Sequence, residues 1–64
     1  MKLNGQVRPL EEPVSLLSYL TALGCDPAKV AVERNGQIVP KAQFACVILT
    51  DTDELEVVSF VGGG

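Results

Sequence analysis

One segment of the chain has the hydrophobic period of an α-helix. Its apolar side chains fall at positions i, i+3, i+4 and i+7, which places them on one face of a helix. These residues are Leu16, Tyr19, Leu20 and Leu23. Ser15 precedes them as a candidate N-cap, and Gly24 follows as a candidate C′ residue. The pattern predicts an amphipathic helix of about ten residues, with Tyr19 as a packing residue.

Two Asn-Gly pairs predict β-hairpins on either side of this helix. Asn4-Gly5 divides residues 1–9, and Asn35-Gly36 divides residues 30–39. Asparagine and glycine accept the positive φ angles of a two-residue turn between antiparallel strands. In the first hairpin, alternation places Met1 and Leu3 on one face of the strand.

The final apolar segment, residues 54–60, alternates with the period of a strand. One face carries Leu55, Val57 and Ser59, and the other carries Glu56, Val58 and Phe60. Before it, residues 51–53 read as a polar turn. Residues 41–44 are too few for a stable helix, so they predict a single helical turn that places Phe44 beneath the sheet.

The order hairpin, helix, hairpin, final strand predicts an α+β domain of the ubiquitin-like β-grasp type. A helix that joins two hairpins crosses one face of their common sheet. The final strand then enters the middle of a mixed sheet of about five strands, parallel to the first strand. We expect a domain over residues 1–61 and a flexible glycine tail over residues 62–64.

Length and charge restrict the function. With 64 residues, the chain is one domain that buries roughly 60% of its unfolded surface. The net charge is −3, without a basic cluster, which argues against nucleic-acid binding and favours a partner with a basic face. No apolar run reaches the roughly 20 residues of a membrane span, and no signal peptide opens the chain. We therefore expect a cytoplasmic protein that binds no membrane.

The residues that usually perform catalysis or bind metals are sparse. The chain has no histidine, so a serine or cysteine nucleophile lacks its usual base. Cys25 and Cys46 fit no metal-ligand spacing and are expected to be idle thiols. Acidic residues cluster at turns and at a strand start, where carboxylates are expected to be solvated and not metal ligands. These are Glu11, Glu12, Asp51, Asp53, Glu54 and Glu56. The sequence predicts neither an enzyme nor a metal site.

The candidate functional site is instead the end of the chain. Gly62, Gly63 and Gly64 lack side chains and can pass through a narrow channel in a partner. Val58 and Phe60 precede them on one strand face and predict an apolar docking patch. The sequence leaves an alternative open for each of these features. The terminal glycine run can be a frayed end without function, and Phe60 can fold back over its own sheet edge instead of forming a docking patch.

With these elements placed, nearly the whole chain resembles the ThiS family, the small sulfur carriers of thiamine thiazole biosynthesis. The resemblance rests on the opening Leu3-Asn4-Gly5, the helix ending at Leu23-Gly24, the stretch 30–40 (VAVERNGQIVP), and residues 56–64. Two departures from the family pattern are Thr52-Asp53, where Gly-Asp is common, and a third glycine in the tail.

The resemblance implies that the chain is a protein co-substrate that binds no cofactor itself. An E1-like adenylating enzyme of the ThiF type would use ATP and Mg²⁺ to convert the Gly64 carboxylate to an acyl-adenylate. A cysteine desulfurase or another persulfide donor would supply sulfur, giving a thiocarboxylate that a thiazole synthase of the ThiG type consumes. Gly62 and Gly63 would thread into the partner's active site. Val58, Phe60 and Val61 would dock the body, an inference that rests mainly on strand alternation.

Two other functions remain open on the sequence. The first is a sulfur carrier for another product, such as the small subunit of molybdopterin synthase, which is usually longer. The second is a ubiquitin-like interaction module or modifier that binds through Val58 and Phe60 without sulfur chemistry.

Overall fold

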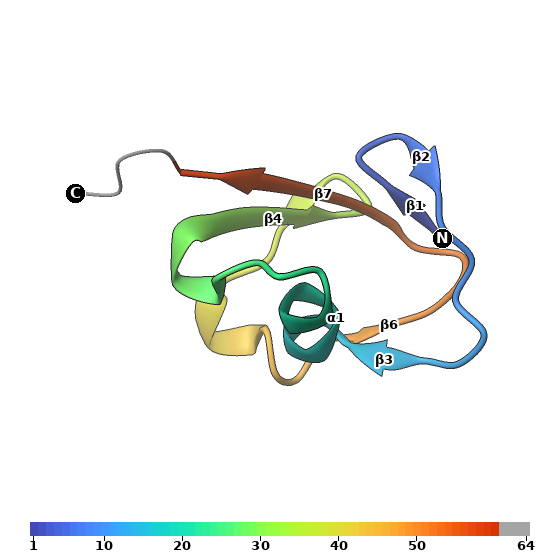
Figure 1. The fold of residues 1–64 in the computed structure, drawn as a ribbon, viewed down its shortest axis with the longest axis horizontal. Helices are drawn as coiled ribbons and strands as arrows, with labels where there is room; N and C mark the ends of the chain where they lie inside the picture. Colours follow the sequence, from blue (N-terminus) through green and yellow to red (C-terminus); the bar gives the residue numbers. More distant parts are fainter. Residues whose placement is uncertain (61–64) are drawn as a thin grey trace.

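A five-stranded mixed sheet forms the body of the protein in the computed structural model, which describes residues 1–60 (Figure 1). The sheet order is β2-β1-β7-β4-β5. Its strands are β1 (Lys2–Leu3), β2 (Gln6–Val7), β4 (Val30–Arg34), β5 (Gln37–Ile38) and β7 (Glu54–Ser59). The last strand, β7, lies in the middle, parallel to β1 and antiparallel to β4. This confirms the predicted β-grasp topology.

The helix α1 (Leu16–Ala22) crosses one side of the sheet, as Figure 1 shows. It begins as predicted, because the Ser15 side chain accepts a hydrogen bond from the Ser18 backbone N–H. It ends before Gly24, whose φ of +81° is readily adopted by glycine. The helix has seven residues and is shorter than expected. The expectation that Leu23 lies in the core stripe is wrong, because Leu23 is the C-cap residue and is exposed.

A second, two-stranded sheet was not predicted from the sequence. It pairs β3 (Val14–Ser15) with β6 (Ile48–Leu49) in an antiparallel arrangement. Strands of two residues are too short to show an alternating pattern. This ladder fixes the chain that enters α1 to the chain that leads into β7, so it closes the domain below the main sheet (Figure 1).

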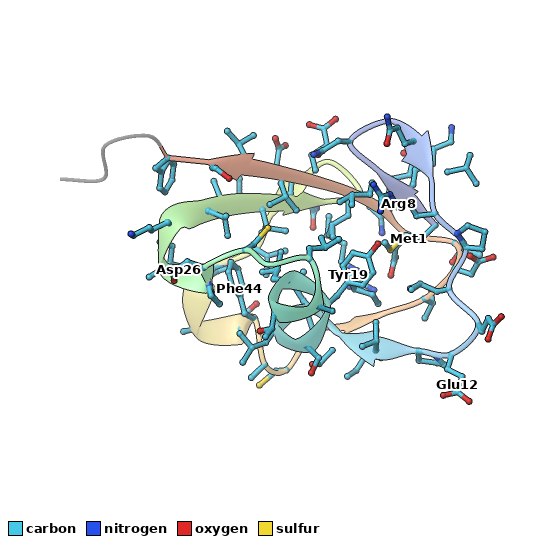
Figure 2. The ribbon with its side chains drawn as sticks, viewed as in Figure 1. Met1, Arg8, Glu12, Tyr19, Asp26 and Phe44 are labelled. Atoms are coloured by element: carbon cyan, nitrogen blue, oxygen red, sulfur yellow. The ribbon has the colours of Figure 1, made fainter. Side chains whose placement is uncertain are left out.

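Two short 3₁₀ helices complete the connections. η1 (Pro27–Lys29) is capped by Asp26, whose side chain accepts a hydrogen bond from the Ala28 N–H. η2 (Lys41–Gln43) is the single turn predicted before Phe44. Phe44 is buried beneath the sheet beside α1, as the side chains in Figure 2 show.

The hydrophobic core lies between the sheet and α1. Its buried members come from every layer of the fold: Met1, Leu3, Leu16, Leu20, Val30, Val32, Phe44, Leu49 and Leu55. Tyr19 is half-buried and packs against this cluster (Figure 2), which confirms its predicted packing role. Among the described residues, no helix is long and apolar enough to cross a bilayer.

Candidate functional site

The central strand β7 is the element that leads toward the glycine tail. From Leu55 to Ser59, each residue lies opposite a residue of β4. The backbone N–H of Phe60 then donates a hydrogen bond of 2.8 Å to the Lys29 carbonyl oxygen. The strand is therefore anchored up to the last residue that the structure describes. Its end lies at the opposite side of the domain from the N-terminus (Figure 1).

Asn4 anchors β7 on its other edge. In the first hairpin turn it adopts a φ of +51°, as expected for an Asn-Gly turn. Its Oδ1 accepts a 2.8 Å hydrogen bond from the Val57 N–H, and its Nδ2 donates a 3.3 Å bond to the Val57 carbonyl oxygen. The amide side chain thus replaces the strand partner that β1 is too short to provide. Sequence reasoning assigned Asn4 only a turn role and missed this contact.

Asn35, in the second Asn-Gly turn, makes a similar contact at the start of β7. Its Oδ1 accepts a 2.9 Å hydrogen bond from the Glu54 N–H, and its Nδ2 donates a 3.0 Å bond to Oδ1 of Asp53. The two turn asparagines therefore hold the two edges of the same strand. The sequence feature that could have indicated these contacts is that both turns have Asn at a position where Asp and Gly are also common.

The expectation that the acidic residues are solvated is wrong for Asp53, which is only 5% exposed. Besides Asn35, its carboxylate accepts hydrogen bonds from the Thr50 N–H at 2.9 Å and from Nη2 of Arg34 at 3.2 Å. Desolvation opposes ionisation, but these hydrogen bonds and the positive charge of Arg34 outweigh it and lower the pKa of Asp53. A buried carboxylate needs such partners, and short-range sequence patterns do not show them.

Asp51 is exposed and performs a different structural role. Its Oδ1 accepts hydrogen bonds from the Met1 ammonium at 2.6 Å and from the Leu10 N–H at 2.9 Å. The hydrogen bond from the ammonium, the bond from Leu10 and the positive charge lower the pKa of Asp51. Within residues 1–60, no group of three or more His, Cys, Asp or Glu side chains is placed to hold a metal ion.

Both docking residues that fall in the described part of the chain are exposed. Val58 is 59% exposed and Phe60 is 50% exposed. Val58 lies on the sheet face that turns away from α1, opposite Ala31 of β4. The Phe60 ring lies 5.5 Å from the ammonium of Lys41, which also donates a hydrogen bond to the Ala28 carbonyl oxygen. Phe60 therefore lies beside η1 and η2, and half of its surface is accessible.

The other predicted site residues lie outside the described part of the chain. These are Val61, Gly62, Gly63 and Gly64. Cys25 is half-buried and Cys46 is exposed, and both are free thiols. What the structure brings together is a central strand anchored on both edges and two exposed apolar side chains near its end.

Comparisons with known proteins agree with this geometry. The sequence model of the ThiS family matches residues 1–64. The crystal structure of the thiamine biosynthesis protein ThiS from Geobacter metallireducens superposes with a TM-score of 0.83 and 29% identity, covering 98% of this chain and 96% of that one.

Relatives of two lengths match the sequence. The sulfur carrier protein ThiS of Bacillus subtilis is 35% identical over 65 residues, which cover 100% of this chain and 98% of that protein. Thiazole synthases from Paramagnetospirillum magneticum and Magnetococcus marinus are 47% and 44% identical over 62 residues, or 97% of this chain. The chain spans only 19% of the length of each of these two proteins. Because the family model covers the chain from end to end and the fold agrees, this protein belongs to the ThiS family.

Proposed function

We propose that this chain is a sulfur carrier of thiamine biosynthesis that acts in the cytoplasm. The observation that carries the proposal is the match of the ThiS family over residues 1–64 to a chain in which the central strand β7, ending at Ser59, is followed after Phe60 and Val61 by three glycines. The similarity to the sulfur carrier protein of Bacillus subtilis, over the full length of both chains, supports the same role.

The proposed chemistry takes place at the carboxylate of Gly64. A carboxylate is a poor electrophile, so an E1-like adenylating enzyme first joins it to the α-phosphorus of ATP and releases pyrophosphate. Mg²⁺ in that enzyme neutralises the phosphate charge. The terminal sulfur of a protein persulfide then attacks the carbonyl carbon and displaces AMP. A thiol cleaves the resulting acyl disulfide and leaves the thiocarboxylate.

In this scheme the chain contributes positioning and no catalytic group. The anchored strand β7 fixes where the tail begins, and Gly62 and Gly63 extend Gly64 into the partner's active site. Val58, Phe60 and Val61 form the docking surface of the body. Val58 and Phe60 are exposed, as such a surface requires.

We further propose that a thiazole synthase receives the sulfur. Two proteins of that name contain a segment 47% and 44% identical to this chain. A carrier domain and a thiazole synthase that share one polypeptide have a high effective concentration for each other, as expected of successive partners in one reaction. A persulfide donor, such as a cysteine desulfurase, and the adenylating enzyme complete the set of partners.

Complementation of a thiamine-requiring bacterial strain that lacks its own carrier tests this function. We expect the wild-type chain to restore growth without thiamine and a variant lacking Gly63 and Gly64 to fail. Circular dichroism of both proteins controls for folding, since the deletion removes none of the residues 1–60 that form the core and the sheet. Growth supported equally by the truncated variant would contradict the proposal and favour a ubiquitin-like interaction module.

A further inference from the structure

The sheet face that turns away from α1 carries an unusual charge arrangement. Leu3 lies opposite Leu55, and both are buried against the helix, so their strand neighbours point to the other face. We call this other face the open face. Its side chains are Lys2, Val7, Ala31, Glu33, Ile38, Glu54, Glu56 and Val58. No helix or strand among residues 1–60 covers it (Figure 1).

Two glutamates lie directly opposite each other at the centre of the open face. Glu33 of β4 is in register with Glu56 of β7. Like charges on directly opposed residues of neighbouring strands destabilise a sheet. Neither carboxylate forms an ion pair with any of the described residues, whereas Glu54, on the same face, lies 3.8 Å from the ammonium of Lys2. Within residues 1–60, no ion pair therefore offsets the negative charges of Glu33 and Glu56.

Apolar side chains flank this glutamate pair. Ile38, directly opposite Glu33 on the outer strand, is 78% exposed. Val58 follows Glu56 by two residues, on the same face and nearer the end of β7. A surface with exposed apolar groups around an uncompensated pair of carboxylates fits a partner that places cations between apolar contacts.

A second copy of this chain does not fit the open face. Two copies meeting face to face would bring six carboxylates, from Glu33, Glu54 and Glu56 of each copy, against the two Lys2 ammonium groups. Like-charge contacts across an interface disfavour that partner strongly. The occupant is therefore a different protein, one whose surface carries positive charge.

We propose that Glu33 and Glu56 form the recognition site for a pair of arginine or lysine side chains on the thiazole synthase, with Ile38 and Val58 packing beside them. This inference rests on the proposed function, because it names the chemistry of the partner that receives the tail. The glutamate pair selects and orients that partner, and its repulsion is relieved when the cations arrive. Glu56 lies four residues before Phe60, so the docked partner is held near the end of β7.

The test compares two double variants with the same change in net charge. E33Q/E56Q removes the pair on the open face, and E11Q/E12Q removes two exposed carboxylates from the loop before β3. The equilibrium dissociation constant of each full-length chain for the thiazole synthase of the same organism is measured by calorimetry at two NaCl concentrations. We expect E33Q/E56Q to raise Kd roughly tenfold and to weaken its salt dependence, and E11Q/E12Q to leave both nearly unchanged.

A melting curve excludes misfolding as the cause. E33Q/E56Q removes a repulsion, so its Tm is expected to equal or exceed that of the wild type. Equal Kd values for the two double variants, or no binding of the wild type to the synthase, overturn the proposal. The proposed function fails separately: a wild-type chain that never acquires a thiocarboxylate contradicts it, whichever way the binding comparison ends.

Discussion

Replacement of Asp53 by alanine tests whether the buried carboxylate holds the turn before β7. The carboxylate accepts hydrogen bonds from the Thr50 N–H, from Asn35 and from the Arg34 guanidinium. A hydrogen bond to a charged group contributes about 1.5–3 kcal/mol, and a buried donor left without an acceptor costs about 1–3 kcal/mol. These contributions overlap, so we expect Asp53→Ala to lower the free energy of unfolding by about 3 kcal/mol.

That loss is large for a chain of 64 residues. Domains are stabilised by about 0.05–0.15 kcal/mol per residue, which gives roughly 3–10 kcal/mol here. In a domain of this size each kcal/mol shifts Tm by about 4–8 °C. The Tm of Asp53→Ala, measured by circular dichroism, should therefore fall by roughly 12–24 °C.

Glu54 provides the matched control for this substitution. It is the neighbouring acid, but its side chain is exposed, and among residues 1–60 it forms an ion pair with Lys2 alone, at 3.8 Å. Exposed ion pairs contribute about 0–1 kcal/mol, so Glu54→Ala should change Tm by only a few degrees. Equal shifts for the two variants, or a Tm of Asp53→Ala within a few degrees of the wild type, would refute this account of the turn.

The remaining predictions concern pH, a turn asparagine and the core. Because the folded-state pKa of Asp53 lies below the unfolded value of about 3.9, its stabilising contribution is complete above that pH and is lost as pH falls through the folded pKa. The difference in free energy of unfolding between wild type and Asp53→Asn, measured by urea titration, should thus become smaller as the pH is lowered. A difference that does not change with pH would contradict this linkage. Asn4→Gly keeps the positive φ but removes both hydrogen bonds to Val57. The free energy of unfolding should fall by about 1 kcal/mol, and the Val57 amide hydrogen should exchange faster with solvent. An unchanged exchange rate would show that the Asn4 side chain does not anchor β7. Leu20→Ala should lower the free energy of unfolding by about 2–5 kcal/mol, because Leu20 is fully buried. Leu23→Ala, at the exposed helix end, should lower it by less than about 1 kcal/mol in thermal melts. Similar losses for the two variants would place Leu23 in the core.

The sequence predicted the main elements because their signals are local. The spacing of Leu16 and Leu20, the two Asn-Gly turns and the alternation after Glu54 each depend on residues close together in the chain. Gly24 was correctly expected as the C′ residue, but Leu23 was misplaced because the helical period continues through the C-cap residue, whose side chain is exposed.

What the sequence did not predict depends on contacts between distant segments. In the sequence, Asp53 resembles an ordinary polar turn residue. Its partners Arg34, at the end of β4, and Asn35, in the turn that follows β4, reach it only in the folded chain. The pairing of β3 with β6 could not be predicted from local sequence patterns either, since the paired residues are more than 30 positions apart in the chain. The pairing of Glu33 with Glu56 needed the strand register, which a list of acidic residues does not contain.

The central claim is that Gly64 carries sulfur as a thiocarboxylate, and intact-mass spectrometry tests it most directly. The full-length chain is incubated with its adenylating enzyme, ATP, Mg²⁺ and a persulfide donor, beside a variant that lacks Gly64. The account predicts a mass gain equal to the exchange of one oxygen for one sulfur in the wild type and no change in the variant. An unchanged wild-type mass, with an adenylating enzyme shown to be active, would contradict the sulfur-carrier account.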